Sequence, residues 1–350
     1  MIESLRPSVR AMAGYTPGEQ PREGEFVKLN TNESPYPPSP RVFEALQAAL
    51  TGDRLRRYPD PLGTHFRRTA GRALGVDPDA VLIGNGSDDV LTILTRAFVP
   101  EGGLVVSPTP SYLLYRTLAE LQGARFRTVD YNADWSLPEP WPAEGAHLTL
   151  IANPNSPSGT VVPPAQLERL AAALRAPLIV DEAYADFAEA DALDLVRKGR
   201  APNVVVTRSL SKSYSLAGVR FGFAVADPAL VRHLVKVKDS YNCDVLSLAA
   251  AAAALEDQEH LRTTRARVLA TRARMEKELA RLGFAVTPSR ANFVWCTRAD
   301  RPVKPVYEEL KRRRVLVRYM NYEGHGDGLR VSVGSDAEID RLLDELNNVL

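Results

Sequence analysis

The sequence has little cysteine, almost no net charge and no long apolar run. Its 350 residues include two cysteines, Cys243 and Cys296, whose number and spacing fit neither a disulfide framework nor a metal site. A formal net charge of +1 gives no electrostatic case for nucleic acid or an anionic membrane surface. No run approaches the roughly 18 apolar residues of a membrane span, and the first residues lack the apolar core of a signal peptide. These absences predict a cytoplasmic protein without a metal, nucleic-acid partners or a membrane.

The sequence does contain a regular alternation of short apolar runs and longer amphipathic stretches. Its hydrophobic content of 45% is enough for a large domain and a smaller one. The apolar runs lie at residues 80–84, 103–107, 147–154, 177–184, 203–209 and 221–227. This rhythm predicts an α/β fold whose mostly parallel sheet carries helices on both faces. Residues 87–98 have helical spacing and are predicted to form a helix with Ser87 as its N-cap.

The pattern of apolar and charged residues changes past about residue 260, which indicates a second domain. A basic amphipathic stretch at 262–283 precedes several short apolar runs, a pattern typical of helices layered on a small sheet. We therefore predict a large domain over 46–258 and a small C-terminal domain over 259–350. Residues 1–45, rich in proline and glycine, are predicted to pack against the small domain.

Three apolar runs end in side chains with useful chemistry. Asn153, Asp181 and Ser209 each stand where a predicted strand finishes. An open parallel sheet binds its ligands at the carboxyl ends of its strands, so this edge is the expected ligand site. A carboxylate buried directly after Leu178-Ile-Val is costly unless it is paired, so Asp181 is expected to have a cationic partner. That partner could equally be an arginine in a structural salt bridge or a bound ligand.

A lysine stands close to the end of one of these strands. A lone lysine there is usually a surface residue, but Lys212 lies in the stretch SLSKSYSLAGVRFG with Ser209, Ser211 and Arg220. A second anion-friendly turn, GNGSDD at 84–89, leads into the predicted helix. Together these parts predict a phosphate-bearing cofactor, an amine able to form a Schiff base with it, and a carboxylate for a ring nitrogen. Pyridoxal phosphate is the cofactor that such a set binds.

Nine motifs, in order, give the chain a resemblance to a known family. They are KLNTNESPYPP, RRYPDP, GNGSDDV, SPTPSYLLY, NPNSPSG, VDEAYADF, TRSLSKSYSLAGVRFG, RANFVW and GLRVSVG. In this order and spacing they resemble the fold-type I pyridoxal-phosphate aminotransferases and, among these, the histidinol-phosphate aminotransferases. The resemblance runs from about Ala11 to Val333 and is more specific for the fold and cofactor than for the substrate.

The resemblance implies a set of cofactor contacts. Lys212 would bind pyridoxal phosphate covalently and move the substrate proton, Asp181 would keep the ring nitrogen protonated, and Tyr184 would hydrogen-bond the ring oxygen. The other implied cofactor residues are Ser87, Asp88, Tyr112, Asn155, Ser156, Ser209, Ser211, Arg220 and Tyr58. Tyr58 would reach the cofactor phosphate of a neighbouring subunit, which implies a homodimer with shared active sites.

One motif departs from the family pattern. The family usually has asparagine directly before the second proline of NPNSPSG, where this chain has Ser156. A serine side chain is shorter, so Tyr184 is expected to hold the ring oxygen alone or through water. Asn155 lies one residue too early to be a safe substitute.

The resemblance also implies a substrate and a reaction. The implied substrate-binding residues are Tyr15, Asn32, Asn292, Arg318 and Arg330. Glutamate would give its amino group to the cofactor and leave as 2-oxoglutarate, and imidazole acetol phosphate would then take the group to become histidinol phosphate, a phosphorylated amino alcohol. The alternatives are a threonine-phosphate decarboxylase or an aromatic amino-acid aminotransferase of the same fold. A non-catalytic regulator that binds pyridoxal phosphate is a more distant alternative.

Overall fold

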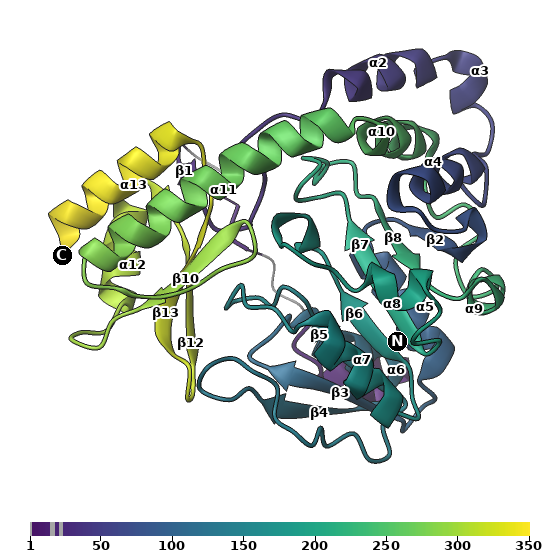
Figure 1. The fold of residues 1–350 in the computed structure, drawn as a ribbon, viewed down its shortest axis with the longest axis horizontal. Coiled ribbons are helices and arrows are strands. Elements are labelled where there is room, and N and C mark those ends of the chain that lie inside the picture. The colour runs from purple at the N-terminus through teal and green to yellow at the C-terminus, as the bar shows by residue number, and fades with distance from the viewer. Residues whose placement is uncertain (1, 15–17, 21–23) are drawn as a thin grey trace.

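The chain folds into a large and a small sheet joined by one long helix. A computed structural model describes residues 2–14, 18–20 and 24–350. Figure 1 shows the large sheet wrapped by helices and the small sheet beside it, with α11 (Gln258–Arg281) passing from one to the other. This arrangement confirms the predicted α/β fold class.

The large sheet is mostly parallel, as predicted. Among the described residues it has seven strands, in the order β2 (Val81–Gly84), β8 (Gly222–Val225), β7 (Val204–Ser209), β6 (Leu178–Asp181), β5 (Leu148–Ala152), β3 (Leu104–Thr109) and β4 (Arg125–Asp130). Only β8 runs antiparallel to its neighbours in this part of the chain. The six predicted apolar runs each contribute a strand. The sequence did not reveal β4, because this edge strand has only exposed and half-buried residues and no continuous apolar run.

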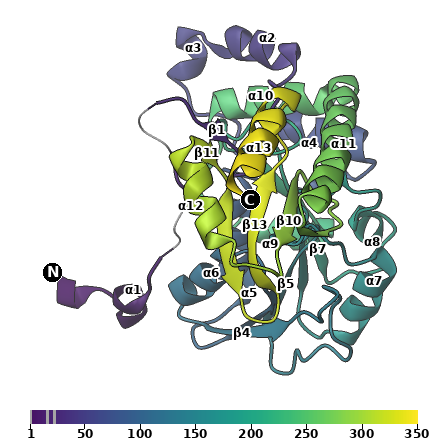
Figure 2. The same cartoon turned by 90° about the vertical axis from the view of Figure 1, so that its left-hand side faces the viewer.

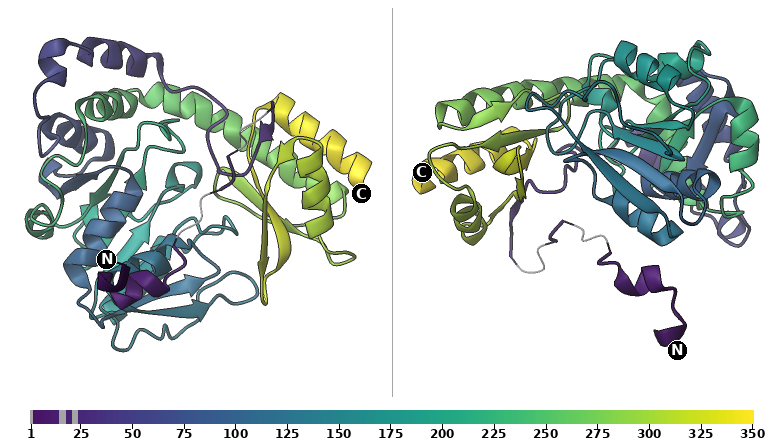
Figure 3. Two further views of the ribbon diagram at one scale, coloured as in Figure 1. Left: turned by 180° about the vertical axis from the view of Figure 1, so that it is seen from behind. Right: turned by 90° about the horizontal axis from the view of Figure 1, so that it is seen from below.

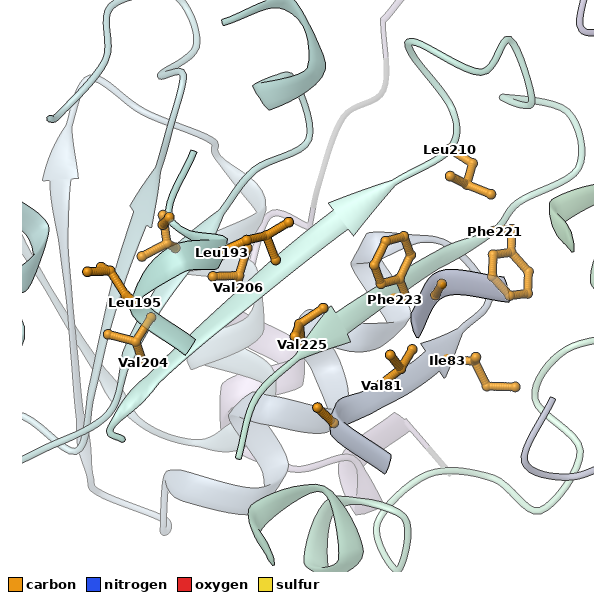
Figure 4. Close-up of a cluster of buried hydrophobic side chains, with 14 of the residues drawn as sticks. Val81, Ile83, Leu193, Leu195, Val204, Val206, Leu210, Phe221, Phe223 and Val225 are labelled. Carbon is orange, nitrogen blue, oxygen red and sulfur yellow. The ribbon is translucent and has the colours of Figure 1, made fainter. Parts of the chain in front are cut away.

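Helices cover both faces of the large sheet because its central strands are buried on both sides. Successive residues of β6 alternate between two cores: Leu178 and Val180 face one, and Ile179 faces the other. The first core is closed by α4 (Thr64–Leu74), α7 (Pro164–Ala173), α8 (Leu193–Arg197) and α10 (Val245–Glu256). The second is closed by α5 (Ser87–Phe98), α6 (Leu114–Gln122) and α9 (Pro228–Leu234). Figure 4 shows part of the first core, where Leu193 and Leu195 pack beside Val204 and Val206.

The small sheet is antiparallel and has its own core. In the described chain its strands are ordered β12 (Arg318–Tyr322), β13 (Gly326–Ser332), β10 (Phe293–Thr297) and β9 (Ala285–Thr287). Its apolar face packs on α11, α12 (Lys304–Arg312) and α13 (Asp336–Val349). A short strand near the N-terminus, β1 (Val27–Lys28), pairs in parallel with β11 (Val315–Leu316). The domain boundaries after residues 45 and 258 stay predictions.

The remaining elements are helical. They are η1 (Ile2–Ser4), α1 (Pro7–Ala11), α2 (Pro40–Ala49), α3 (Gly52–Leu55), η2 (Pro78–Ala80) and η3 (Ala185–Phe187). Figures 2 and 3 show α1 at the margin of the molecule, and the Arg6 side chain there donates a hydrogen bond to the Leu121 carbonyl on α6. Of the helices described, none combines the length and the hydrophobicity needed to cross a membrane.

The carboxyl ends of the central strands meet at one edge of the large sheet. β5, β6 and β7 are adjacent and parallel, and their register pairs Ala152 with Asp181 and Asp181 with Thr207. Asn153 and Ser209 therefore lie one and two residues beyond the register of Asp181, at the same edge of the sheet, as their positions at the strand ends predicted. Because parallel strands leave their C-terminal residues facing the same crevice, this edge is where the fold can receive a ligand.

Candidate active site

A cavity of about 300 Å³ opens at this edge, between the large and small sheets. Its walls come from segments that are far apart in the sequence. The predicted site residues that line it are Asn32, Ser87, Asp88, Tyr112, Ser156, Asp181, Tyr184, Ser209, Ser211, Lys212, Arg220, Arg318 and Arg330. The fold thus brings most of the predicted set into one place.

Lys212 lies in the turn after β7, with its amine inside the cavity. Its Nζ donates a hydrogen bond to the Thr31 carbonyl at 3.0 Å and stands 5.9 Å from the centre of the Tyr184 ring. Burial, followed by the positive charge of Arg330, lowers the pKa of Lys212 to about 8. A lowered pKa increases the fraction of neutral amine near pH 7, and the neutral amine is the form that can attack a carbonyl carbon or accept a proton.

Asp181 ends β6 and lies 5% exposed at the cavity wall. Of the two predicted partners, a structural arginine is wrong for the part of the chain that the structure describes, and a bound ligand stays a prediction. Instead, Tyr115 Oη donates to Oδ2 and Thr207 Oγ1 donates to Oδ1, each at 2.8 Å. Burial raises the pKa of Asp181 to about 6, and these two hydroxyl donors oppose that rise. A buried carboxylate with only neutral donors is suited to a cation that arrives with a ligand.

The turn before α5 forms an anion-binding corner. The predicted N-cap at Ser87 is wrong: α5 begins at Ser87, and Gly86 is the N-cap with a φ of 86°, which glycine adopts without strain. β8 passes close to this turn, because a Cβ atom added to Gly222 would overlap the Ser87 backbone nitrogen. The first turn of a helix presents backbone N–H groups that favour phosphate.

Arg220 completes this corner from the opposite side. Its Nη1 donates to Ser211 Oγ at 3.2 Å, and its Nη2 lies 3.5 Å from Asp88 Oδ2. Ser209 Oγ in turn accepts the Ser211 backbone N–H at 3.2 Å. The two serine hydroxyls and the guanidinium therefore converge beside the N-terminus of α5, which is the donor arrangement that binds a phosphate group.

Two tyrosines flank the space between Lys212 and Asp181. Tyr112 Oη donates to Asp88 Oδ1 at 3.1 Å, which holds its ring at the cavity wall. Tyr184 Oη accepts a hydrogen bond from Asn32 Nδ2 at 3.0 Å, and burial raises its pKa. Tyr184 is therefore held as a neutral phenol able to donate a hydrogen bond to a ligand oxygen.

Two arginines of the small sheet reach the cavity together. Arg318 and Arg330 are opposite each other on β12 and β13, so their side chains leave the same face of the sheet. Arg330 Nη1 donates to Ser156 Oγ at 2.9 Å, and Nη2 donates to the Asn30 carbonyl at 2.9 Å. The partner of Ser156 in the described structure is thus a guanidinium from the small sheet.

Asn32 and Asn292 are connected to each other behind the cavity. Asn292 is fully buried, and its Nδ2 donates to the Asn32 carbonyl at 3.0 Å. Asn32 has a φ of 56°, and Ser332 Oγ both donates to its Oδ1 at 2.9 Å and accepts its backbone N–H at 2.8 Å. Asn292 does not line the cavity itself, so it can influence a ligand only through the Asn32 segment.

Besides Asn292, two predicted site residues do not line the cavity. The Asn155 side chain donates to the Pro110 carbonyl and to Ser158 Oγ, and it does not line the cavity. Tyr58 is 80% exposed, outside the cavity, and stacks on Tyr241 with 4.4 Å between ring centres. Tyr15 lies outside the described residues. The predicted contacts of Tyr58 and Tyr15 stay predictions.

Sequence reasoning missed Tyr115 and Thr207, the two donors to Asp181. Thr207 could have been found, since it lies two residues before Ser209 on a strand and therefore shares its face. Tyr115 gave a weaker signal, because a tyrosine in an apolar helix turn is usually a packing residue. Among the described residues, no group of three or more His, Cys, Asp or Glu side chains is placed to hold a metal ion.

Pyridoxal phosphate fits these residues. Its aldehyde needs an amine with a lowered pKa, its ring nitrogen a buried carboxylate that has only neutral donors, and its phosphate a serine–arginine corner at a helix N-terminus, and the site has all three. Such a site, at the carboxyl edge of a mostly parallel seven-stranded sheet, defines a pyridoxal-phosphate-dependent transferase.

Comparisons with known proteins agree with this class. The family "Aminotransferase class I and II" matches residues 24–346. A histidinol-phosphate aminotransferase of Rhodopirellula baltica is 53% identical over 96% of this chain and 92% of its own length, and one of Trichormus variabilis is 46% identical over the full length of both. The crystal structure of the Sinorhizobium meliloti histidinol-phosphate aminotransferase in complex with pyridoxal-5'-phosphate superposes with a TM-score of 0.89, covers 99% of this chain and 97% of its own, and is 28% identical. The chain belongs to the class I and II aminotransferase family and, within it, to the histidinol-phosphate aminotransferases.

Proposed function

We propose that this protein transfers the amino group of glutamate to imidazole acetol phosphate, giving 2-oxoglutarate and L-histidinol phosphate in histidine biosynthesis. The observation that carries the proposal is the pair of arginines, Arg318 and Arg330, that faces one cavity with Lys212 and Asp181. Like charges directly opposite on a sheet repel, so their placement is favourable when an anionic substrate lies between them. We further propose that the enzyme acts in the cytoplasm.

The protein's own residues divide the chemical work. When bound, pyridoxal phosphate supplies an electron-withdrawing ring that stabilises negative charge developing at the substrate carbon. Lys212 Nζ is the group that takes the proton from that carbon and returns it, because its amine lies in the cavity with a lowered pKa. Asp181 holds a proton on the ring nitrogen, and Tyr184 Oη orients the ring oxygen. The phosphate is held by the backbone N–H groups of Ser87 and Asp88 and by the side chains of Ser209, Ser211 and Arg220. Tyr112 packs on the ring.

The second anion-binding group is what separates this substrate from an ordinary amino acid. Histidinol phosphate has no α-carboxylate, so its phosphate must supply the charge that anchors it. Arginine binds phosphate with two parallel hydrogen bonds, and a second guanidinium beside Arg330 suits a doubly charged group. Glutamate needs less positive charge from the same two arginines. Tyr15 is proposed to assist at the phosphate, and Asn32, held by Asn292, to border the substrate.

We expect Arg318→Ala to discriminate between the two half-reactions. Losing a charge-assisted contact to a buried anion costs about 2–5 kcal/mol, so kcat/KM for the phosphorylated substrate should fall about 30-fold or more. The glutamate half-reaction should fall much less. Single-turnover spectroscopy of the cofactor, with each substrate separately, measures both. Arg312→Ala, which removes an exposed arginine of α12, is the matched control and should leave both unchanged. Equal losses in the two half-reactions would mean that Arg318 only supports the fold.

A second prediction concerns Ser156. Its Oγ accepts a hydrogen bond from Arg330 Nη1, so Ser156→Ala should leave the guanidinium less well fixed and raise KM for both substrates about tenfold, with kcat little changed. Ser156→Asn keeps an acceptor oxygen and should lose less. Steady-state kinetics with each variant makes the comparison. An unchanged KM in Ser156→Ala would remove Ser156 from the substrate site.

We also propose that the enzyme is a homodimer whose active sites are shared. The support is the exposed apolar surface formed by α2, α3 and the segment after them, which is unusual for a monomer. Its exposed large side chains are Phe43, Leu50, Leu55, Tyr58 and Leu62. Tyr58 lies outside the cavity of its own subunit, so its proposed contact with a cofactor phosphate requires the partner's site.

A further inference from the structure

The carboxylate of Asp181 is held from behind by two hydroxyl groups. Tyr115, the second residue of α6, is 1% exposed, and its Oη lies 2.8 Å from Asp181 Oδ2. Thr207, on β7, is fully buried, and its Oγ1 lies 2.8 Å from Oδ1. Asp181 lines the cavity, whereas neither donor does. Each carboxylate oxygen thus has one hydroxyl donor on the protein side and lone pairs left for a ligand.

We propose that Tyr115 is a positioning residue that, with Thr207, orients Asp181 and keeps it ionised to receive the cofactor's ring nitrogen. This inference rests on the proposed role of Asp181 at that nitrogen. Two fixed donors determine the plane of the carboxylate, so its remaining lone pairs point in defined directions. A carboxylate that could rotate would pair less well with a planar ring.

The need for these donors follows from burial. Desolvation favours the protonated acid, and the negative charge of Asp88 on α5 adds to that effect. Tyr184, which follows β6, also faces Asp181 as a neutral phenol. The groups that favour the ionised form are the Tyr115 and Thr207 hydroxyls and the Ala183 backbone N–H. Burial and the nearby carboxylate raise the pKa of Tyr115 well above its usual value, so Tyr115 stays protonated and remains a donor.

Tyr115 also holds its position through packing. Its ring contacts Tyr112 edge-on, with 5.6 Å between centres and 84° between planes, and it belongs to the core beneath α5 and α6. Tyr112 lines the cavity and is the residue proposed to pack on the cofactor ring. The segment that leads into α6 therefore supplies both Tyr112, at the cavity, and Tyr115, behind Asp181.

The test is the affinity for pyridoxal phosphate as a function of pH. Tyr115→Phe keeps the ring packing and removes one charge-assisted hydrogen bond, which should raise the pKa of Asp181 by about one to two units. The wild-type pKa is about 6. The variant should therefore bind the cofactor about 5- to 50-fold more weakly than the wild type at pH 6, where its carboxyl is protonated. At pH 9 both carboxyls are ionised, so the two affinities should be nearly equal.

Matched variants separate this role from a merely structural one. Tyr131→Phe removes another buried phenol, whose hydroxyl has no hydrogen-bond partner in the described structure, and should match the wild type at both pH values. Thr207→Val removes the second donor and should repeat the loss at low pH, which keeps the test decisive if Tyr115→Phe does not fold. An affinity ratio for Tyr115→Phe that stays the same from pH 6 to pH 9 would overturn the inference.

Asp181→Asn distinguishes a failure of the inference from a failure of its premise. The amide cannot be deprotonated, so its affinity for the cofactor should be weakened at every pH. If Asp181→Asn binds as tightly as the wild type, the role of Asp181 at the ring nitrogen is wrong. If Asp181→Asn is weakened and Tyr115→Phe is not, only the role of Tyr115 is wrong.

Discussion

Replacing Lys212 by alanine should abolish amino transfer, with a loss on the order of 10⁴-fold or more in kcat. Lys212 Nζ is the amine in the cavity whose pKa is lowered to about 8. Its removal takes away both the covalent attachment of the cofactor and the group that moves the substrate proton. Steady-state production of 2-oxoglutarate from glutamate measures the loss. Thermal unfolding should show that the variant is folded.

Lys236→Ala is the control for Lys212→Ala, because this lysine is exposed just after α9 and lies outside the cavity. It should retain wild-type turnover. A Lys212→Ala enzyme that kept near-normal turnover would show that another group moves the proton and would refute the assignment of the site.

The second large effect is expected from Asp181→Asn. Asparagine has nearly the same shape, and its single amide oxygen can still accept a hydrogen bond from one of the two hydroxyls of Tyr115 and Thr207, while its NH2 group can donate to the other. It carries no charge, however, to hold a proton on the ring nitrogen. Electrostatic groups aimed at developing charge typically contribute 10²–10³-fold, so kcat should fall about 10³-fold. Single-turnover measurement of the glutamate half-reaction at saturating cofactor isolates this step from weakened cofactor binding.

The activity of Asp181→Asn at saturating cofactor distinguishes a chemical role of Asp181 from a role in cofactor binding alone. A loss that persists at saturating cofactor locates the effect in the chemical step. Full activity at saturating cofactor would mean that Asp181 only helps to bind the cofactor, and the electrostatic part of the proposal would be wrong.

Much of the fold could be predicted from the sequence, because the buried strands are short apolar runs separated by amphipathic helices. The edge of the sheet that carries the site could also be predicted, since parallel strands that finish near Asn153, Asp181 and Ser209 bring these residues to the same edge. The edge strand β4 could not be predicted, because its residues are exposed or half-buried and lack a continuous apolar run.

The partners of the site residues were harder to predict, because they are contacts between segments far apart in the chain. Asp181 receives its donors from 66 residues earlier and 26 residues later. Ser156 accepts a hydrogen bond from Arg330, 174 residues away. Physical reasoning required that the buried Asp181 be satisfied, but only the packing of α6 against the sheet selects a tyrosine hydroxyl rather than an arginine.

One assay tests the central proposal most directly: purified enzyme with pyridoxal phosphate, glutamate and imidazole acetol phosphate, followed for both products. We predict that 2-oxoglutarate and L-histidinol phosphate appear in equal amounts, and that the amino acceptor without its phosphate is used far less well. Equal use of the acceptor with and without phosphate would contradict the proposal. So would a parallel assay with threonine phosphate in which carbon dioxide is released in place of amino transfer.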